Sequence, residues 1–347
     1  MGIVHVFNPE HDIALAANLS NFTAPHAGRQ LRADLGYLPA LWADDADAVL
    51  VENMDYAQRQ YYRLRSRIGG RQPLFVDRHQ LSRMSFTRVE PWGWDLALRS
   101  QLLRYGVDCV PAEEEIAVVR HLSHRRTAAQ LLPQLQREGT VGESYECTCG
   151  KDVEELLQRY GQVIMKAPWS SSGRGLRFLS LQNTPFAKQA NWFNNIVRTQ
   201  GSVMVEPLYA RVKDFGMEFS ADAEGRIHYE GLSLFHTVNG AYVGNLITTE
   251  ERKRELLSHY VPVCLLDWTQ QQIVRLLHVD GYWGPFGIDM MIVRNEGGGF
   301  LLHPCVEINL RRTMGHVALA VSPATADVPR IMRIRLDSHY KLSIRKA

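Results

Sequence analysis

Residues 286 to 310 of this chain read FGIDMMIVRNEGGGFLLHPCVEINL, two apolar segments around a glycine-rich turn. Such a pattern predicts a β-hairpin, with strands at Phe286–Val293 and Phe300–Leu310. Asp289 and Glu307 are equidistant from Gly298, so regular pairing places their carboxylates opposite each other across the hairpin. Because like charges so placed repel, we expect a cation between them, and a divalent metal would fill that position.

Strand alternation predicts further polar side chains beside these carboxylates. Residues two apart face the same side of a strand, so Asn309 and Arg311 are expected on the same face as Glu307. Oxygen ligands beside a guanidinium suit Mg²⁺ that carries phosphate groups. A solvated strand face is the alternative, since charged residues on exposed strands are ordinary, and a one-residue bulge would break the symmetry of the pairing.

Length and composition describe a globular protein of more than one folding unit. The chain has 347 residues, of which 45% are hydrophobic and 22% charged, so two or three units with sizeable cores are expected. A formal net charge of +2 with scattered basic residues gives no reason to expect a nucleic acid partner. The five dispersed cysteines fit free thiols better than a disulfide framework.

Hydropathy predicts neither a membrane span nor a leader segment. No stretch approaches the roughly 20 apolar residues that cross a bilayer. The strand-like segment Ile3–Phe7 follows the N-terminus directly, without the apolar region of a signal peptide. We therefore expect no membrane partner and a cytoplasmic location.

The order of apolar and helical segments divides the chain into three expected parts, 1–118, 119–206 and 207–347. The first alternates short strands with helices, which is typical of an α/β unit with a parallel sheet. We expect strands at Ile3–Phe7, Ala48–Val51, Pro73–Val76, Gln162–Lys166, Leu176–Leu181, Ser202–Glu206, Phe215–Ala221 and Ile227–Phe235. We expect helices at Ala57–Arg67, Trp94–Tyr105, Arg125–Glu138, Lys151–Tyr160, Phe186–Val197, Glu250–Ser258 and Gln270–Leu277, and a loop at His236–Thr249.

The segment from Lys166 to Gly175, KAPWSSSGRG, is a turn rich in hydroxyl-bearing and small side chains behind a strand lysine. Successive backbone N–H groups in such a turn can bind phosphate oxygens while the ammonium supplies the opposite charge. The segment lacks the Gly-x4-Gly-Lys-Ser/Thr spacing and lies between two strands, so a P-loop fold is not expected. A plain hairpin loop is the alternative.

Taken in chain order, these motifs resemble the ATP-grasp superfamily. The order is Lys166, the Ser/Gly turn, the extended strand Val203–Glu206, Asp289, and then Glu307 with Asn309. The resemblance covers roughly residues 123 to 315. It implies an α/β chain, α+β in its ATP-binding part, with an N-terminal Rossmann-like pre-ATP-grasp domain at 1–118. Residues 119–206 would form the central subdomain with the glycine-rich loop, and 207–347 the C-terminal subdomain with the metal-binding hairpin.

The resemblance also implies a role for each matching residue. Lys166 would contact the α- or β-phosphate, and the loop over the β- and γ-phosphates would consist of Ser170, Ser171, Ser172 and Gly173. Adenine would bind Glu206 and the backbone of Val205 and Leu208, and the ribose would bind Glu218, with Asp214 as the competitor. Mg²⁺, or Mn²⁺ in its place, would be held by Asp289, Glu307 and Asn309. Lys166 and Arg311 would act in catalysis, Arg311 at the transferred phosphoryl group or the acyl phosphate.

One position departs from the pattern of the superfamily. Its members usually carry a further lysine in a Ser-x-Lys context at the start of the second part, where this chain has Ser123-His124-Arg125. Arginine keeps the charge and can bind phosphate through two N–H groups, but its geometry differs from that of lysine. We expect Arg125 to contact phosphate, and an arginine on a helix surface is the alternative.

Candidates for substrate contact come from two places. Asn8 and Glu10 follow the first expected strand, and ligands of open α/β sheets bind at the carboxyl ends of strands. The same Asn-Pro-Glu sequence is also typical of an ordinary turn. Arg312 and His316 follow the expected metal-binding strand, where similar enzymes bind the acceptor carboxylate, and His316 as a general base is a hypothesis.

These assignments predict an ATP- and Mg²⁺-dependent ligase. It would activate a carboxylate as an acyl phosphate and join it to an amine or thiol, with release of ADP and phosphate. The expected partners are a small-molecule carboxylate and an amine, and a homo-oligomer is compatible with the sequence. A phosphotransferase of the same fold and a non-catalytic nucleotide-binding regulatory protein are the alternatives.

Overall fold

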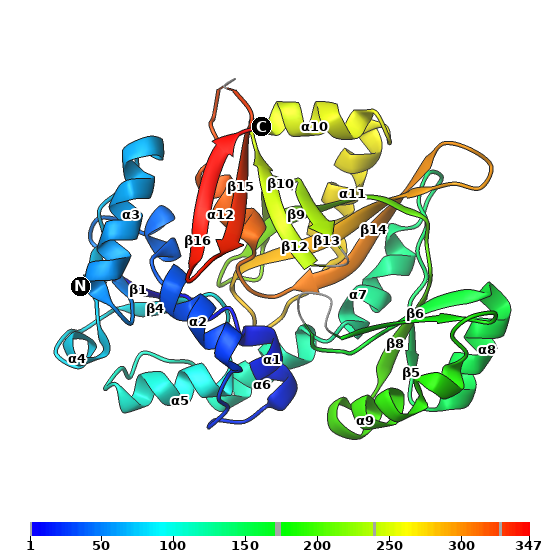
Figure 1. Ribbon diagram of the computed structural model, residues 1–347, viewed down its shortest axis with the longest axis horizontal. Helices are drawn as coiled ribbons and strands as arrows, with labels where there is room; N and C mark the ends of the chain where they lie inside the picture. Colours follow the sequence, from blue (N-terminus) through cyan, green and yellow to red (C-terminus); the bar gives the residue numbers. More distant parts are fainter. Residues whose placement is uncertain (1, 171–174, 239–240, 326–327) are drawn as a thin grey trace. The chain divides into compact units, whose positions relative to one another are not determined.

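The computed structural model describes residues 2–170, 175–238, 241–325 and 328–347, with Val238 and Ala241 described by their backbone alone. The chain forms two compact units, shown in sequence colours in Figure 1. The first unit consists of Met1–Arg120, Val243–Glu250 and Leu310–Ala347, and the second of His121–Tyr242 and Glu251–Asn309. Residues 310–347 thus cluster with the N-terminal part of the chain, and the three-part division by motifs stays a prediction.

The first unit is built on a parallel sheet of β1 (Ile3–Val6), β2 (Ala48–Leu50), β3 (Leu74–Val76) and β4 (Arg88–Pro91). The strand order is β3-β2-β1-β4, so the sheet grows in opposite directions from β1. This confirms the parallel α/β sheet predicted for the first part. Its helices are α1 (His11–Ala17), α2 (His26–Leu35), η1 (Leu38–Leu41, a 3₁₀ helix), α3 (Met54–Ile68), α4 (Arg78–Leu81), α5 (Leu96–Arg104), α6 (Glu113–Leu122) and α12 (Met314–Ala320).

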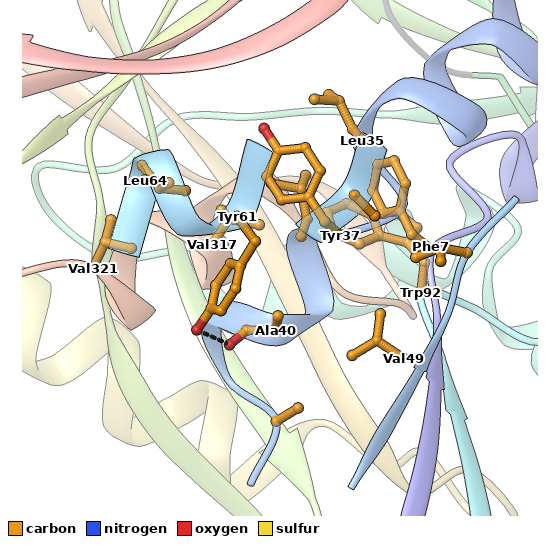
Figure 2. Packing of buried hydrophobic residues seen from close by; sticks show 14 of the residues in the cluster. Phe7, Leu35, Tyr37, Ala40, Val49, Tyr61, Leu64, Trp92, Val317 and Val321 are labelled. Carbon is orange, nitrogen blue, oxygen red and sulfur yellow. Dashed lines mark hydrogen bonds between the residues drawn. The ribbon is translucent and has the colours of Figure 1, made fainter. Parts of the chain in front are cut away.

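Apolar side chains cover both faces of this sheet, as expected for parallel strands. Val4 and Val6 belong to one buried cluster, together with Leu98 and Leu102 of α5. The other cluster, shown in Figure 2, contains residues from both ends of the chain. Its labelled members are Phe7, Leu35, Tyr37, Ala40, Val49, Tyr61, Leu64, Trp92, Val317 and Val321. The C-terminal residues therefore supply part of the core on which the N-terminal sheet packs.

Antiparallel strands complete the first unit. Strand β15 (Arg330–Leu336) pairs with β16 (Tyr340–Lys346) and, on its other edge, with β12 (Ala241–Ile247). The loop predicted at His236–Thr249 is therefore wrong, because β11 (Phe235–Val238) and β12 occupy most of it. Ile247 is fully buried and pairs with Arg330, a partner too distant in the sequence for a local pattern to reveal.

The second unit contains two antiparallel sheets of different order. One is β5-β8-β6-β7, made of β5 (Tyr145–Cys147), β6 (Gln162–Lys166), β7 (Leu176–Ser180) and β8 (Val203–Pro207). The other is β10-β9-β13-β14, made of β9 (Arg211–Ala221), β10 (Ile227–Ser233), β13 (Gly284–Arg294) and β14 (Phe300–Asn309). The helices are α7 (Arg126–Leu131), η2 (Leu132–Leu135), α8 (Gly150–Tyr160), η3 (Phe186–Lys188), α9 (Ala190–Gln200), α10 (Glu250–Ser258) and α11 (Val263–Leu276).

Helices α8 and α9 pack on the first of these sheets. Val153 and Leu157 of α8 and Phe193 of α9 are buried in a cluster with Val163 and Val205 of the sheet. Burial of these apolar side chains is the main stabilising contribution to this part of the unit. The two helices thereby fix the position of the sheet, which carries Lys166 at the end of β6 and Glu206 near the end of β8.

None of the helices in the described ranges combines the length and the apolar composition that crossing a bilayer requires.

Candidate active site

The predicted hairpin forms as β13 and β14, and it carries the two expected carboxylates. Asp289 is paired with Glu307 across the two strands, and Gly287 is paired with Asn309 two residues further along each strand. Residues two apart on a strand share a face, so Glu307 and Asn309 lie on the same side as Asp289. We call Asp289 and Glu307 the acidic pair.

The pairing of β13 with β14 is irregular between the turn and Glu307, because its register shifts between Met291 and Asp289. Near the turn, Met291 is paired with His303, and a regular continuation of that register would leave Glu307 two residues past Asp289. Instead, three residues of β14 face a single residue of β13 between these two pairs. Pro304 is one of the three, and it has no N–H to donate to the neighbouring strand. The predicted pair is observed, but the regular pairing from which we predicted it is wrong.

Strand β9 brings a third carboxylate to this face. Gly216 is paired with Asp289 on the other edge of β13, and Glu218 lies two residues further along. A Cβ atom at Gly216 would lie 3.5 Å from Glu218 Oε1 and 3.7 Å from Asp289 Oδ1, so the two carboxylates flank this glycine. Glu218 is buried, whereas the competing ribose candidate Asp214 pairs with Arg211 Nη1 at 3.2 Å.

The residues of this face fit a magnesium ion. Two opposed carboxylates with an amide oxygen in the next row are the hard oxygen donors that Mg²⁺ prefers. The glycine between Glu218 and Asp289 leaves space where a side chain would otherwise stand. Within the described ranges, no group of three or more His, Cys, Asp or Glu side chains is arranged to hold a metal. The predicted site therefore relies on the acidic pair and Asn309.

Arg125 contacts the acidic pair. It is the N-cap residue of α7 and is 8% exposed, so the alternative of an arginine on a helix surface is wrong. Its Nη1 lies 2.7 Å from Glu307 Oε2. Its Nε donates to Ala167 O at 3.1 Å, and its Nη2 donates to Ser170 O and Oγ, both at 3.4 Å. We call residues Lys166 to Gly175 the Ser/Gly segment. One guanidinium thus joins Glu307 of the acidic pair to this segment.

Lys166 and Glu206 form a buried ion pair. Lys166 Nζ is 2.5 Å from Glu206 Oε2, and both side chains are less than a tenth exposed. They lie on neighbouring antiparallel strands, where Ile164 is opposite Glu206. The other carboxylate oxygen of Glu206 accepts a hydrogen bond from Ser144 Oγ at 3.3 Å. The sequence predicts separate ligand contacts for the two charged residues, and no motif marks Ser144.

The charges around the site change the pKa values of two buried residues of β14, Cys305 and His303. Burial raises the pKa of the Cys305 thiol, and the carboxylates of Glu206 and of the acidic pair raise it further. Burial lowers the pKa of His303 to about 4, with Glu206 opposing this change and Lys166 adding to it. His303 is therefore neutral at pH 7. Neither residue carries a sequence signal of function, because both occupy ordinary strand positions.

The Ser/Gly segment is closed at its base. Ala167 N donates to Gly175 O at 2.8 Å. A Cβ atom at Gly175 would lie 2.3 Å from Ser170 Oγ, so a larger residue there would displace Ser170. Three predicted phosphate contacts fall outside the described residues, namely Ser171, Ser172 and Gly173.

The expected adenine contacts of the backbone lie on β8 and just beyond it. Val205 is fully buried and has strand partners on both sides, Tyr145 and Met165. The N–H of Leu208 donates to Gln162 O at 3.1 Å, while the side chain of Leu208 is 40% exposed. The sheet therefore already uses the N–H of Leu208.

In the first unit, polar residues hold the turn after β1 in place. Asn8 is 1% exposed, and its Nδ2 donates to Gly93 O at 2.8 Å and to Asp95 Oδ2 at 3.1 Å. Both amide hydrogens of Asn8 are thus used within the unit. Glu10 Oε1 pairs with Arg32 Nη1 at 2.8 Å, and its Oε2 is buried without a hydrogen-bond partner among the described residues. Glu10, unlike Asn8, thus has a buried polar atom to which no described residue donates a hydrogen bond.

Arg311 and Arg312 belong to the first unit, where each meets a carboxylate. Strand β14 ends at Asn309, so the alternation from which we placed Arg311 on that strand's face does not extend to it. Arg311 Nε and Nη2 donate to Asp12 Oδ1 and Oδ2, each at 2.7 Å. Arg312 Nη2 lies 3.3 Å from Glu90 Oε2.

His316 takes part in the start of helix α12. Thr313 Oγ1 accepts from the N–H of Gly315 at 3.0 Å and from that of His316 at 3.4 Å. The N–H of Thr313 donates in return to His316 Nδ1 at 3.1 Å, which completes a capping box. Since Nδ1 accepts a hydrogen bond, the proton of the neutral ring is on Nε2. The general-base role stays a hypothesis.

Comparisons with protein families and with curated proteins find no match. Solved structures do match over nearly the whole chain. N5-carboxyaminoimidazole synthetase from Staphylococcus aureus, complexed with ADP, is 11% identical and has a TM-score of 0.51, covering 96% of this chain and 82% of that one. The biotin carboxylase domain dimer of 2-oxoglutarate carboxylase from Hydrogenobacter thermophilus, with MgADP, ADP and bicarbonate, is 11% identical with a TM-score of 0.52, covering 96% and 74%. Biotin carboxylase from Campylobacter jejuni is 13% identical with a TM-score of 0.51, covering 96% and 75%.

These solved structures have the ATP-grasp fold, and the fold predicted from the sequence is thereby confirmed. At 11% to 13% identity the likeness concerns the fold alone. Fold does not by itself determine activity, so the function is argued from the residues of the site.

Proposed function

We propose that this protein is an ATP- and Mg²⁺-dependent ligase that activates a carboxylate as an acyl phosphate and joins it to an amine, releasing ADP and phosphate. One observation carries the proposal: within an ATP-grasp fold, Arg125 connects the acidic pair to the Ser/Gly segment that begins beside the buried ion pair. Neighbouring structures contain ADP, and one contains MgADP with bicarbonate, which supports a nucleotide and a carboxylate-like substrate.

Each part of the site has a proposed role toward ATP. Arg125, Lys166 and Ser170 bind the phosphates, and the predicted phosphate contacts of Ser171, Ser172 and Gly173 lie outside the described residues. Glu206 and the backbone at Val205 and Leu208 bind adenine, and Glu218 binds the ribose. The acidic pair and Asn309 would hold Mg²⁺, which supplies charge neutralisation at the β- and γ-phosphates. The division of the chain at residues 118 and 206 is part of the same proposal.

The proposed chemistry has two steps. A carboxylate oxygen of the substrate attacks the γ-phosphorus, the bond from phosphorus to the ADP oxygen breaks, and an acyl phosphate forms. The amine nitrogen then attacks the acyl carbon, inorganic phosphate leaves, and the amine loses a proton. We propose that Arg311 stabilises the charge that develops on the acyl phosphate, as a guanidinium can through paired N–H groups. Covering the intermediate protects it from water.

The surroundings of the enzyme are also proposed. The partners are a small-molecule carboxylate and a small-molecule amine, in the cytoplasm. A contact of Glu10 with the amine is supported by its Oε2, which has no hydrogen-bond partner in the part of the chain that the structure describes. We also propose that the protein forms a homo-oligomer. The biotin carboxylase domain from Hydrogenobacter thermophilus, which is a dimer, supports this proposal.

The test is a screen of metabolite pools for compounds that trigger release of ADP from ATP, followed by mass spectrometry of the products. A ligase consumes the carboxylate and the amine and produces free phosphate in step with ADP. Phosphate that stays on the acceptor, with no amine consumed, would establish the phosphotransferase instead. If the protein fails to bind ATP with Mg²⁺ at all, the regulatory alternative fails together with the ligase.

A further inference from the structure

Arg125 lies between the residues proposed to bind the metal and those proposed to bind the nucleotide phosphates. The guanidinium of Arg125 pairs with Glu307 through Nη1, while Nε and Nη2 donate to Ala167 and Ser170 at the start of the Ser/Gly segment. Its three nitrogens therefore span the distance between the proposed metal ligand and the proposed phosphate-binding segment.

The charge of Arg125 is permanent. A guanidinium stays protonated in proteins, so it cannot neutralise itself when a second cation approaches. Because Arg125 and Glu307 are largely buried, water screens their interaction with a nearby metal only weakly. Magnesium on the acidic pair would then face a fixed positive charge, and it would compete with Nη1 for the same carboxylate oxygen.

A nucleotide phosphate removes this conflict. Phosphate oxygens accept paired N–H groups of arginine in the same way as a carboxylate does, so they can replace Glu307 as the partner of the guanidinium. Once the phosphate compensates Arg125, both oxygens of Glu307 are available to the metal. The bonds from Arg125 to Ala167 and Ser170 connect this exchange to the base of the loop.

We propose that Arg125 makes tight metal binding conditional on nucleotide: it occupies Glu307 until a nucleotide phosphate takes over its guanidinium, so that Mg²⁺ binds strongly only together with ATP. This inference rests on the proposed function and adds a property to the same site. It assigns Arg125 a positioning role toward Glu307 as well as a phosphate contact.

The test is calorimetric titration of the purified protein with Mg²⁺ alone, repeated with Mn²⁺ by electron paramagnetic resonance. We expect R125Q to bind Mg²⁺ alone about tenfold or more tightly than the wild type, since a neighbouring charge shifts ion affinity by at least that factor. R126Q is the matched control: Arg126 is the next residue and pairs with Glu146 at 2.7 Å instead of with Glu307. It should bind Mg²⁺ as the wild type does, and D289N added to R125Q should remove the gain.

A second measurement uses a non-hydrolysable ATP analogue in the presence of EDTA, where R125Q should bind about tenfold more weakly than the wild type, because it lacks the phosphate contact. Melting curves show whether R125Q is folded, and R125M, of similar length, replaces it if needed. Equal affinity of wild type, R125Q and R126Q for Mg²⁺ alone, in a protein that binds the analogue with Mg²⁺, would overturn the conditional binding and leave the ligase proposal standing. Wild type that binds Mg²⁺ as tightly alone as with the analogue would overturn it too. Absence of analogue binding in every variant would overturn both proposals.

Discussion

The two units hold the side chains predicted to bind ligands in partly different ways. In the second unit, the residues predicted to bind ligands pair with each other, Arg125 with Glu307 and Lys166 with Glu206. In the first unit, three of the residues predicted to bind ligands are also in ion pairs, namely Glu10, Arg311 and Arg312. Two others are bound to the main chain, Asn8 to Gly93 O and His316 to Thr313 N.

This difference separates exchangeable contacts from structural ones. A pair of opposite charges can open to accept a ligand of matching charge on each side, so that its members are satisfied in both states. A side chain that bonds to the main chain fixes a turn or a helix end, and its loss lowers stability without any ligand being involved. Variants at ion pairs and variants at main-chain contacts should therefore differ in which property they change.

The largest effect is expected at the acidic pair. Asp289→Asn keeps the size of the side chain but removes a charge from the proposed metal ligands, so ATP turnover should fall at least about a hundredfold, since bound metal supplies several kcal/mol of charge stabilisation. ADP release measures turnover, and circular dichroism should show an unchanged fold. Glu307→Gln should behave likewise. Mg²⁺-dependent activity retained in both variants would refute the metal assignment.

The buried ion pair should show the largest effect on stability. Lys166→Met leaves Glu206 buried without its cation, which should cost about 3 to 5 kcal/mol of unfolding free energy. Urea denaturation measures this cost. The double variant Lys166→Met with Glu206→Gln carries no unpaired charge, so it should recover part of the loss. A single variant within about 1 kcal/mol of the wild type would show that the pair is open in solution, because exposed pairs contribute no more.

His303 should make the stability of the second unit depend on pH. Its pKa in the folded chain is about 4, below the ordinary value of 6.5, so between these values the unfolded chain binds a proton that the folded chain excludes. The free energy of unfolding should therefore fall as the pH drops from 7 to 4, by roughly 3 kcal/mol from this group. Denaturation curves of the wild type and His303→Gln at both pH values isolate it. Parallel losses in the two proteins would contradict the prediction.

The smallest effect is expected at His316 in the first unit. Glutamine can also accept the N–H of Thr313 at this helix position, so His316→Gln should change the unfolding free energy by less than about 1 kcal/mol. Turnover measured from pH 6 to pH 9 should keep its profile, because the ring holds a helix end. A large loss of turnover with normal stability would instead support the general-base hypothesis.

Local sequence patterns predict the bounds of those strands and helices whose signals lie within the element itself. Strand Gln162–Lys166 and helix Glu250–Ser258 have the bounds that their patterns predict. The helix expected to run from Arg125 to Glu138 ends at Leu131, because Pro133 cannot donate to the preceding turn and a 3₁₀ helix follows. Pro133 is itself a sequence signal for the end of this helix, so the predicted bound at Glu138 is wrong.

The features that could not be predicted from the sequence depend on contacts between residues far apart in the chain. The pairing of β12 with β15 depends on a partner strand near the C-terminus. Arg125 could be recognised as a departure from a pattern, but its contact with Glu307 follows from how α7 and β14 pack. Ser144 contacts Glu206 from a segment without any motif, so only the folded chain reveals it.

The irregular segment of β14 also makes the two ends of the hairpin independent of each other. Asp289 is fixed by β9, which pairs with β13 without interruption from Gly284 to Ile292. Glu307 is positioned after the irregular segment, so the register at the glycine turn does not determine where it lies. A change in the length of the glycine turn should therefore leave the acidic pair in place.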